Sequence, residues 1–124
     1  MIIGGTDGLL ILGLCLVRFL SYSSGWQLWN TSIILEGEVA HFAFFSILTA
    51  SFAKAGGFPL HTWVPDFSKD SIVEAAAFLP ASLDKLLGIY LLARMVLSMF
   101  ILTTLVHMIV ITLGALTIII AVMM

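Results

Sequence analysis

Two lysines lie in segments that otherwise have the composition of membrane-spanning helices. Lys54 comes just before a Gly-Gly-Phe-Pro break, and Lys85 lies in the middle of the next apolar run. A charged side chain at the centre of a bilayer costs about 2.5–3.5 kcal/mol on insertion scales, so an intramembrane lysine indicates a functional site. Because burial disfavours the charged form of lysine, such a residue can bind and release a proton. Two cations on neighbouring helices, one beside a helix break, are typical of a path for protons or sodium ions.

Each lysine also has a structural interpretation. Lys54 is close to Gly57, so its stem can extend to the membrane surface and leave the charge in water. Lys85 is far from both ends of its apolar run and requires a partner or a water-filled cavity. Asp84 is its neighbour, but adjacent helical residues point about 100° apart. We therefore expect Asp84 to pair with another helix or to carry ions itself.

The histidines are weaker candidates for the same path. His107 lies in an apolar helix, where it serves either as a proton relay or as a hydrogen-bonded core residue. His61 lies beside Trp63, where a structural role at the membrane interface competes with a role in ion transfer. The three histidines are too dispersed for a haem or zinc site, and Cys15 is the single cysteine. The sequence thus predicts no catalytic group, metal site or cofactor site in this chain.

Composition places the chain in the membrane class. It has 124 residues, of which 61% are hydrophobic and 10% charged. Soluble domains contain about 25% charged residues and need that polar surface to stay dissolved. The formal net charge of −2 provides no basic patch for nucleic acid. The N-terminus carries Asp7 and lacks the basic region of a signal peptide, so we expect a spanning helix there.

The hydropathy pattern predicts an all-α, polytopic membrane protein that forms one helical unit over residues 1–124. Glycines and prolines end the second helix after Lys54 and predict a polar loop over residues 58–71. Pro80 lies inside the third helix and frees a backbone carbonyl one turn earlier. About four transmembrane helices are expected, over residues 8–24, 39–55, 72–95 and 101–124.

Two stretches of this sequence resemble a known family. Ala53–Asp66 is similar to the Lys-x-x-x-x-Pro-Leu-His-x-Trp-Leu-Pro-Asp signature of antiporter-like membrane subunits. Such subunits occur in respiratory complex I, in multi-subunit Na⁺/H⁺ antiporters and in energy-converting membrane-bound hydrogenases. Gly88–Arg94 resembles the end of that family's next helix. Leu79–Tyr90 is most similar to the hydrogenase and related sulfur-reducing branch.

The resemblance implies roles for both lysines. Lys54 matches the lysine at the break of the family's seventh helix, which pairs with a glutamate on the fifth. Lys85 corresponds to the lysine or histidine of the eighth helix, although it lies one position before the usual column. Family members are several times longer, and this chain corresponds to about their sixth to ninth helices. The resemblance therefore implies one piece of a split subunit or a reduced structural copy.

On this basis we expect a membrane subunit of a complex I-like respiratory, hydrogenase or sulfur-reductase complex that contributes to proton or sodium translocation through buried lysines. Lys54, Lys85, Asp84, His61 and His107 are the expected ion-translocation residues, and the choice between H⁺ and Na⁺ stays open. Metal centres and redox chemistry are expected in partner subunits, and one membrane partner is expected to supply a buried glutamate for Lys54. The expected location is the plasma (inner) membrane, in several passes. The alternative is a non-pumping scaffold subunit of the same kind of complex.

Overall fold

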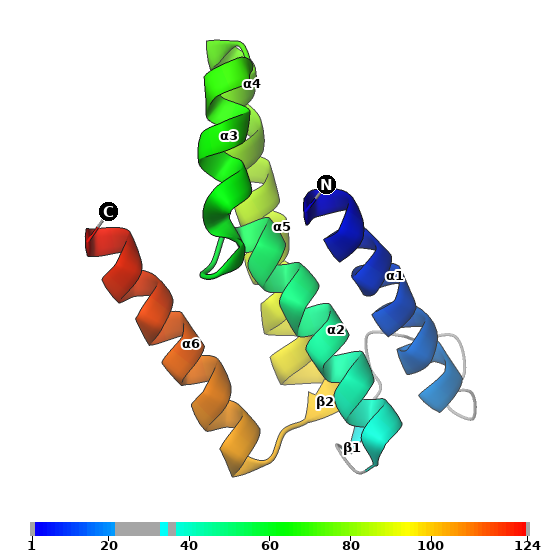
Figure 1. Ribbon diagram of the computed structural model, residues 1–124. Helices are drawn as coiled ribbons and strands as arrows, with labels where there is room; N and C mark the ends of the chain where they lie inside the picture. The colour runs from blue at the N-terminus through cyan, green and yellow to red at the C-terminus, as the bar shows by residue number, and fades with distance from the viewer. Residues whose placement is uncertain (1, 22–32, 35–36, 124) are drawn as a thin grey trace.

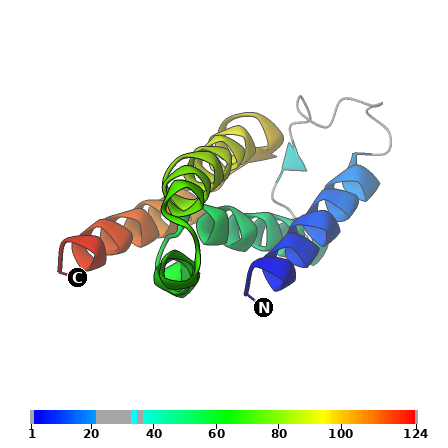
Figure 2. The same ribbon diagram turned by 90° about the horizontal axis from the view of Figure 1, so that it is seen from above.

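The computed structural model describes residues 2–21, 33–34 and 37–123, and it is built almost entirely of helices (Figures 1 and 2). The predicted all-α class is confirmed, apart from a two-residue parallel pairing between β1 (Ile33–Ile34) and β2 (Phe100–Ile101). The α-helices are α1 (Ile2–Leu20), α2 (Glu38–Ala55), α3 (Trp63–Asp70), α4 (Val73–Phe78), α5 (Asp84–Arg94) and α6 (Thr104–Met123).

Helices α1 and α2 form an antiparallel pair, in which the start of α1 lies beside the end of α2 (Figure 1). Gly13 of α1 allows the close approach, because a Cβ atom there would lie 2.6 Å from Cγ1 of Ile47. α1 begins six residues before the apolar run that predicted it, since hydropathy marks apolar residues and a helix can extend beyond them. Residues 22–24 of the predicted first span lie outside the described residues.

The third predicted helix follows one path but is not α-helical throughout. α4 continues into a π-helical segment, η4 (Leu79–Leu83), then into α5 and a second π-helical segment, η5 (Met95–Met99). The N–H of Asp84 donates to the carbonyl of Leu79, five residues earlier, as expected of a π turn. Pro80 has no N–H to donate, and this gives a local reason for the wider turn.

Gly88 fixes the contact between α2 and α5. A Cβ atom at Gly88 would lie 2.6 Å from the backbone N of Ala55 and 2.8 Å from the carbonyl O of Ser51. The two backbones therefore touch at the level of Lys54. Glycine is required here for close approach rather than for an unusual backbone conformation.

The predicted polar loop over residues 58–71 is wrong. This stretch folds into a 3-10 turn, η3 (Leu60–Thr62), and then α3. The prolines that predicted a loop fall where helices tolerate them. Pro59 precedes η3 and Pro65 lies in the first turn of α3, where backbone N–H groups have no helical acceptor.

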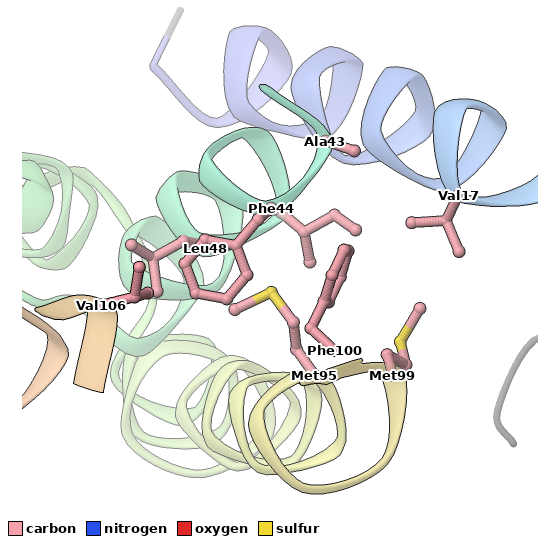
Figure 3. Packing of buried hydrophobic residues seen from close by; sticks show 9 residues of the cluster. Val17, Ala43, Phe44, Leu48, Met95, Met99, Phe100 and Val106 are labelled. Atoms are coloured by element: carbon pink, nitrogen blue, oxygen red, sulfur yellow. The ribbon is translucent and has the colours of Figure 1, made fainter. Parts of the chain in front are cut away.

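The apolar core lies around the N-terminal half of α2, away from Lys54. Figure 3 shows the rings of Phe44 and Phe100 meeting edge to face, with centroids 5.4 Å apart. Met95 and Met99 of η5 close the same cluster from the other side. The buried cluster comprises Val17, Ala43, Phe44, Ile47, Leu48, Met95, Met99, Phe100 and Val106.

Helix α6 is apolar but packs little against the rest of the chain. Only 6% of its most apolar window is buried, with Val106 as its buried residue. Within the described part of the chain, two helical segments are long and apolar enough to cross a membrane, Glu38–Asp70 and Thr104–Met123. An exposed apolar helix of this kind indicates contact with lipid or with a partner subunit.

Candidate functional site

The α2 helix ends immediately after Lys54, as the glycines predicted. Gly56 adopts the left-handed conformation, with φ 71°, and its N–H donates to the carbonyl of Ala53 at 3.2 Å. The N–H of Gly57 donates to the carbonyl of Phe52 at 2.8 Å. These bonds satisfy carbonyl groups that a helix end would otherwise leave unpaired.

Trp63 of α3 completes this helix end. Its indole Nε1 donates a hydrogen bond to the carbonyl of Ala53 at 2.9 Å, and its side chain is buried. α3 is thereby attached to the last turn of α2, next to Lys54. The helix break is therefore a defined, hydrogen-bonded structure.

Lys54 forms an ion pair with Asp7 of α1. The Lys54 Nζ atom lies 2.6 Å from Oδ1 of Asp7, and the two side chains are 23% and 44% exposed. The antiparallel arrangement of α1 and α2 produces this pair, because it places the start of α1 beside the end of α2. Sequence reasoning did not identify Asp7 as a site residue. The available signal was one acidic residue near the start of the first helix and one basic residue near the end of the next.

A small hollow adjoins this ion pair. We call it the Lys54 hollow; its volume is about 10 Å³, and it is lined by Thr6, Ala53, Lys54, Trp63 and Asp84. Asp84 enters from the first turn of α5 and is partly buried. The fold thus brings Lys54 and Asp84 to one site, which their separation in the sequence did not predict.

Lys85 lies in a different place. It is exposed in this chain, so the expectation that both lysines are buried is not confirmed. Because adjacent helical residues diverge, Asp84 lines the Lys54 hollow while Lys85 lines a second, larger space. We call this space the Lys85 cleft; its volume is about 240 Å³, and its lining is Gly56, Phe58, His61, Val64, Pro65, Lys85, Thr117, Ile120 and Ala121.

The two candidate histidines, His61 and His107, lie at different places in the structure. His61 lines the Lys85 cleft, and within the described residues its Nδ1 atom is buried without a hydrogen-bond partner. Its ring lies 6.1 Å from that of Phe58. His107 is exposed near the start of α6, whereas the cleft is lined by residues near the end of that helix. At 1.5 Å per residue, about 15 Å of helix separates His107 from Thr117.

The part of the chain that the structure describes contains no cluster of metal-ligating side chains. None of its His, Cys, Asp and Glu residues gather in groups of three or more that could hold a metal ion. The described arrangement consists instead of one ammonium–carboxylate pair, a second carboxylate, and a second lysine beside a histidine. Such groups can bind, hold and pass protons.

Comparison with known proteins gives two matches. Residues 6–124 match the family profile described as NADH:quinone oxidoreductase/Mrp antiporter, transmembrane. The chain is also 39% identical over 69 residues to NAD(P)H-quinone oxidoreductase subunit 5, chloroplastic, of Anthoceros angustus. That alignment covers 51% of this chain and 9% of the relative, so the chain spans a small fraction of the relative's length. No solved structure matches the chain.

Proposed function

Since this chain belongs to the NADH:quinone oxidoreductase/Mrp antiporter membrane family, we propose that it serves as an ion-translocating membrane subunit of a complex I-like assembly. The observation that carries the proposal is the Lys54–Asp7 ion pair directly beside the broken end of α2. The pair is partly exposed, so its ammonium group can exchange protons with water. Lys54 is the primary proton-binding residue in this proposal.

Lys85 and His61 form the second part of the proposed path. They line one cleft, which is distinct from the Lys54 hollow. The Lys85 ammonium and the His61 Nδ1 atom, which has no hydrogen-bond partner among the described residues, are groups between which water can carry a proton. Asp84 precedes Lys85 in the sequence and lines the first of the two sites. His107 has the weakest support of the proposed residues, because it lies well away along α6.

The finer identity of the assembly is also a proposal. The similarity of Leu79–Tyr90 to the hydrogenase and sulfur-reducing branch favours an energy-converting complex in the plasma membrane, in which this chain makes about four passes. Metal centres and redox chemistry belong to partner subunits in this proposal. A partner glutamate, as the family resemblance implies, would act on Lys54 in addition to Asp7.

A scaffold role is the alternative, and two observations favour it. α6 buries little of its surface within the chain, and Lys85 is exposed, so partner subunits would cover both in an assembly. A subunit whose main task is to fill space between other membrane subunits would also present such surfaces. The two functions differ in whether Lys54 is needed for transport once the complex has assembled.

The test is transport per assembled complex. The native protein is extracted in mild detergent, its co-purifying subunits are identified by mass spectrometry, and the complex is reconstituted into proteoliposomes. We expect Lys54→Ala to lower ion pumping by on the order of a hundredfold, the low end for removal of a proton-transfer group. Lys69→Ala is the matched control, because Lys69 is an exposed cation on α3. Equal pumping by both variants and the wild type would support the scaffold role.

A further inference from the structure

Three charged residues from three helices meet at or beside the Lys54 hollow: Lys54 and Asp84 line it, and Asp7 is the ion-pair partner of Lys54. Asp7 of α1 contacts Lys54 directly, at 2.6 Å, and Asp84 of α5 lines the hollow that Lys54 also lines. Lys54 therefore has one carboxylate in direct contact and a second on the wall of the same hollow. The ion pair with Asp7 alone explains neither the presence of the hollow nor the second carboxylate on its wall.

We propose that Asp7, Lys54 and Asp84 form one charge-sharing unit, in which a single water molecule in the hollow links the Lys54 ammonium to the Asp84 carboxylate. The proposal rests on the proposed function, because it names the group that takes a proton from Lys54. It assigns that role to Asp84. Asp7 is the fixed partner that holds the ammonium in place.

The size and chemistry of the hollow fit one water. A cavity needs roughly 10–15 Å³ of probe-occupied volume, about one probe sphere, to hold a water molecule, and the water needs two to four polar partners. The hollow has a volume of about 10 Å³, and its lining includes an ammonium, a carboxylate and the hydroxyl-bearing Thr6. A larger hydrated channel does not fit in this space.

Transfer through that water balances in both atoms and charge. One N–H bond of the Lys54 ammonium breaks as the water oxygen takes the proton, and the water gives another proton to the Asp84 carboxylate. Lys54 becomes a neutral amine, Asp84 becomes a neutral carboxylic acid, and the water is regenerated. The proton then resides on Asp84, the residue next to Lys85 in the sequence.

The surrounding structure keeps this geometry fixed. Gly88 holds the backbones of α5 and α2 in contact beside Ser51 and Ala55. Trp63 forms part of the wall of the hollow while its indole N–H bonds Ala53. The separation of Lys54 and Asp84 is thus set by the backbone contact of the two helices.

Carbodiimide labelling tests the proposal without measuring transport. The reagent adds to protonated carboxyl groups, so the extent of labelling at Asp7 and Asp84 reports how often each is neutral. The intact membrane complex is treated with dicyclohexylcarbodiimide at mildly acidic pH and digested for mass spectrometry. In Lys54→Ala we expect labelling to rise at both residues, because each loses the neighbouring ammonium group. Lys69→Ala and Lys54→Arg should label like the wild type.

Asp7→Asn gives the decisive second measurement. With Asp7 neutralised, the ammonium is shared with Asp84 alone, so labelling of Asp84 should fall below the wild-type level. General loosening of the fold would raise it instead. A rise at Asp7 alone in Lys54→Ala, or unchanged Asp84 labelling in Asp7→Asn, would overturn the proposal. If labelling changes as expected while pumping is independent of Lys54, the unit exists and the proposed function fails.

Discussion

The indole N–H of Trp63 donates to the carbonyl of Ala53 at 2.9 Å, one residue before the lysine that pairs with Asp7. This bond attaches α3 to the last turn of α2 and so couples the position of Lys54 to the segment after the break. The same carbonyl also accepts the N–H of Gly56 at 3.2 Å. The end of α2 beside Lys54 is therefore stabilised by two hydrogen bonds, one from the next residues of the chain and one from α3.

Trp63→Phe should keep the aromatic packing and remove the hydrogen bond. We expect a loss of about 0.5–1.5 kcal/mol in the free energy of unfolding, the usual contribution of one such bond. The measurement is the thermal unfolding midpoint of the detergent-solubilised complex. Thr112→Val is the control, since it removes a side-chain bond to the carbonyl of Ile109, within α6. A lower midpoint with unchanged pumping would limit Trp63 to a structural role.

Gly88→Ala should destabilise the packing of α2 against α5. The new methyl group would meet the backbone of Ala55 at 2.6 Å, and backbone atoms cannot move aside as a flexible side chain can. Overpacking of this kind costs about 1–3 kcal/mol. Gly114→Ala is the matched control, because no atom lies within 4 Å of its Cβ position. Thermal unfolding should show a loss for Gly88→Ala and, for Gly114→Ala, no loss or a small gain from better helix propensity.

Asp7→Asn should reduce ion pumping, because the Lys54 ammonium loses its direct counter-ion. We expect Asp7→Glu to retain more activity, since the charge is kept on a longer stem. Asp70→Asn, at the exposed end of α3, is the control. The measurement is the redox-driven pH gradient in proteoliposomes, divided by the amount of assembled complex. Equal pumping in Asp7→Asn and Asp70→Asn would remove Asp7 from the path.

Lys85→Leu should leave assembly intact and reduce pumping. The side chain lines the cleft together with His61 and the end of α6, so leucine removes the charge and retains an apolar wall. Lys69→Leu is the control for loss of an exposed cation. Subunit composition by mass spectrometry and pumping per complex are measured on the same preparation. Unchanged pumping would count heavily against a role for Lys85 in translocation.

The sequence predicted the helical class and the stop after Lys54, because glycine and apolar composition act locally. It did not predict α3, since the prolines were interpreted as breaking helices although one precedes a helical turn and the other lies in a first turn. Whether a proline ends a helix or lies in its first turn depends on where that helix begins, which the neighbouring residues alone do not show. The family resemblance, carried by the motif around Lys54, is confirmed by the match over residues 6–124.

The candidate site was predicted only in part, for a physical reason. Lys54 and Lys85 stand out because they interrupt apolar runs. Asp7 does not, because its importance comes from a partner far away in the sequence and opposite in an antiparallel pair. The division of Asp84 and Lys85 between two spaces follows from helical geometry, but their surroundings depend on packing. The sequence alone did not show which side chains pair across helices, and this is why the site was predicted only in part.

The backbone contact at Gly88 also has a consequence for the speed of ion transfer. In the proposed transfer, the main-chain contact between α2 and α5 favours a route that does not need one helix to slide along the other. Rotamer changes and water reorientation then carry the proton, and exposed side chains reorient in picoseconds to nanoseconds, while collective helix shifts take microseconds to milliseconds. Turnover of the parent complex would then be limited by events outside this pair of helices, such as electron delivery or the motion of a neighbouring subunit.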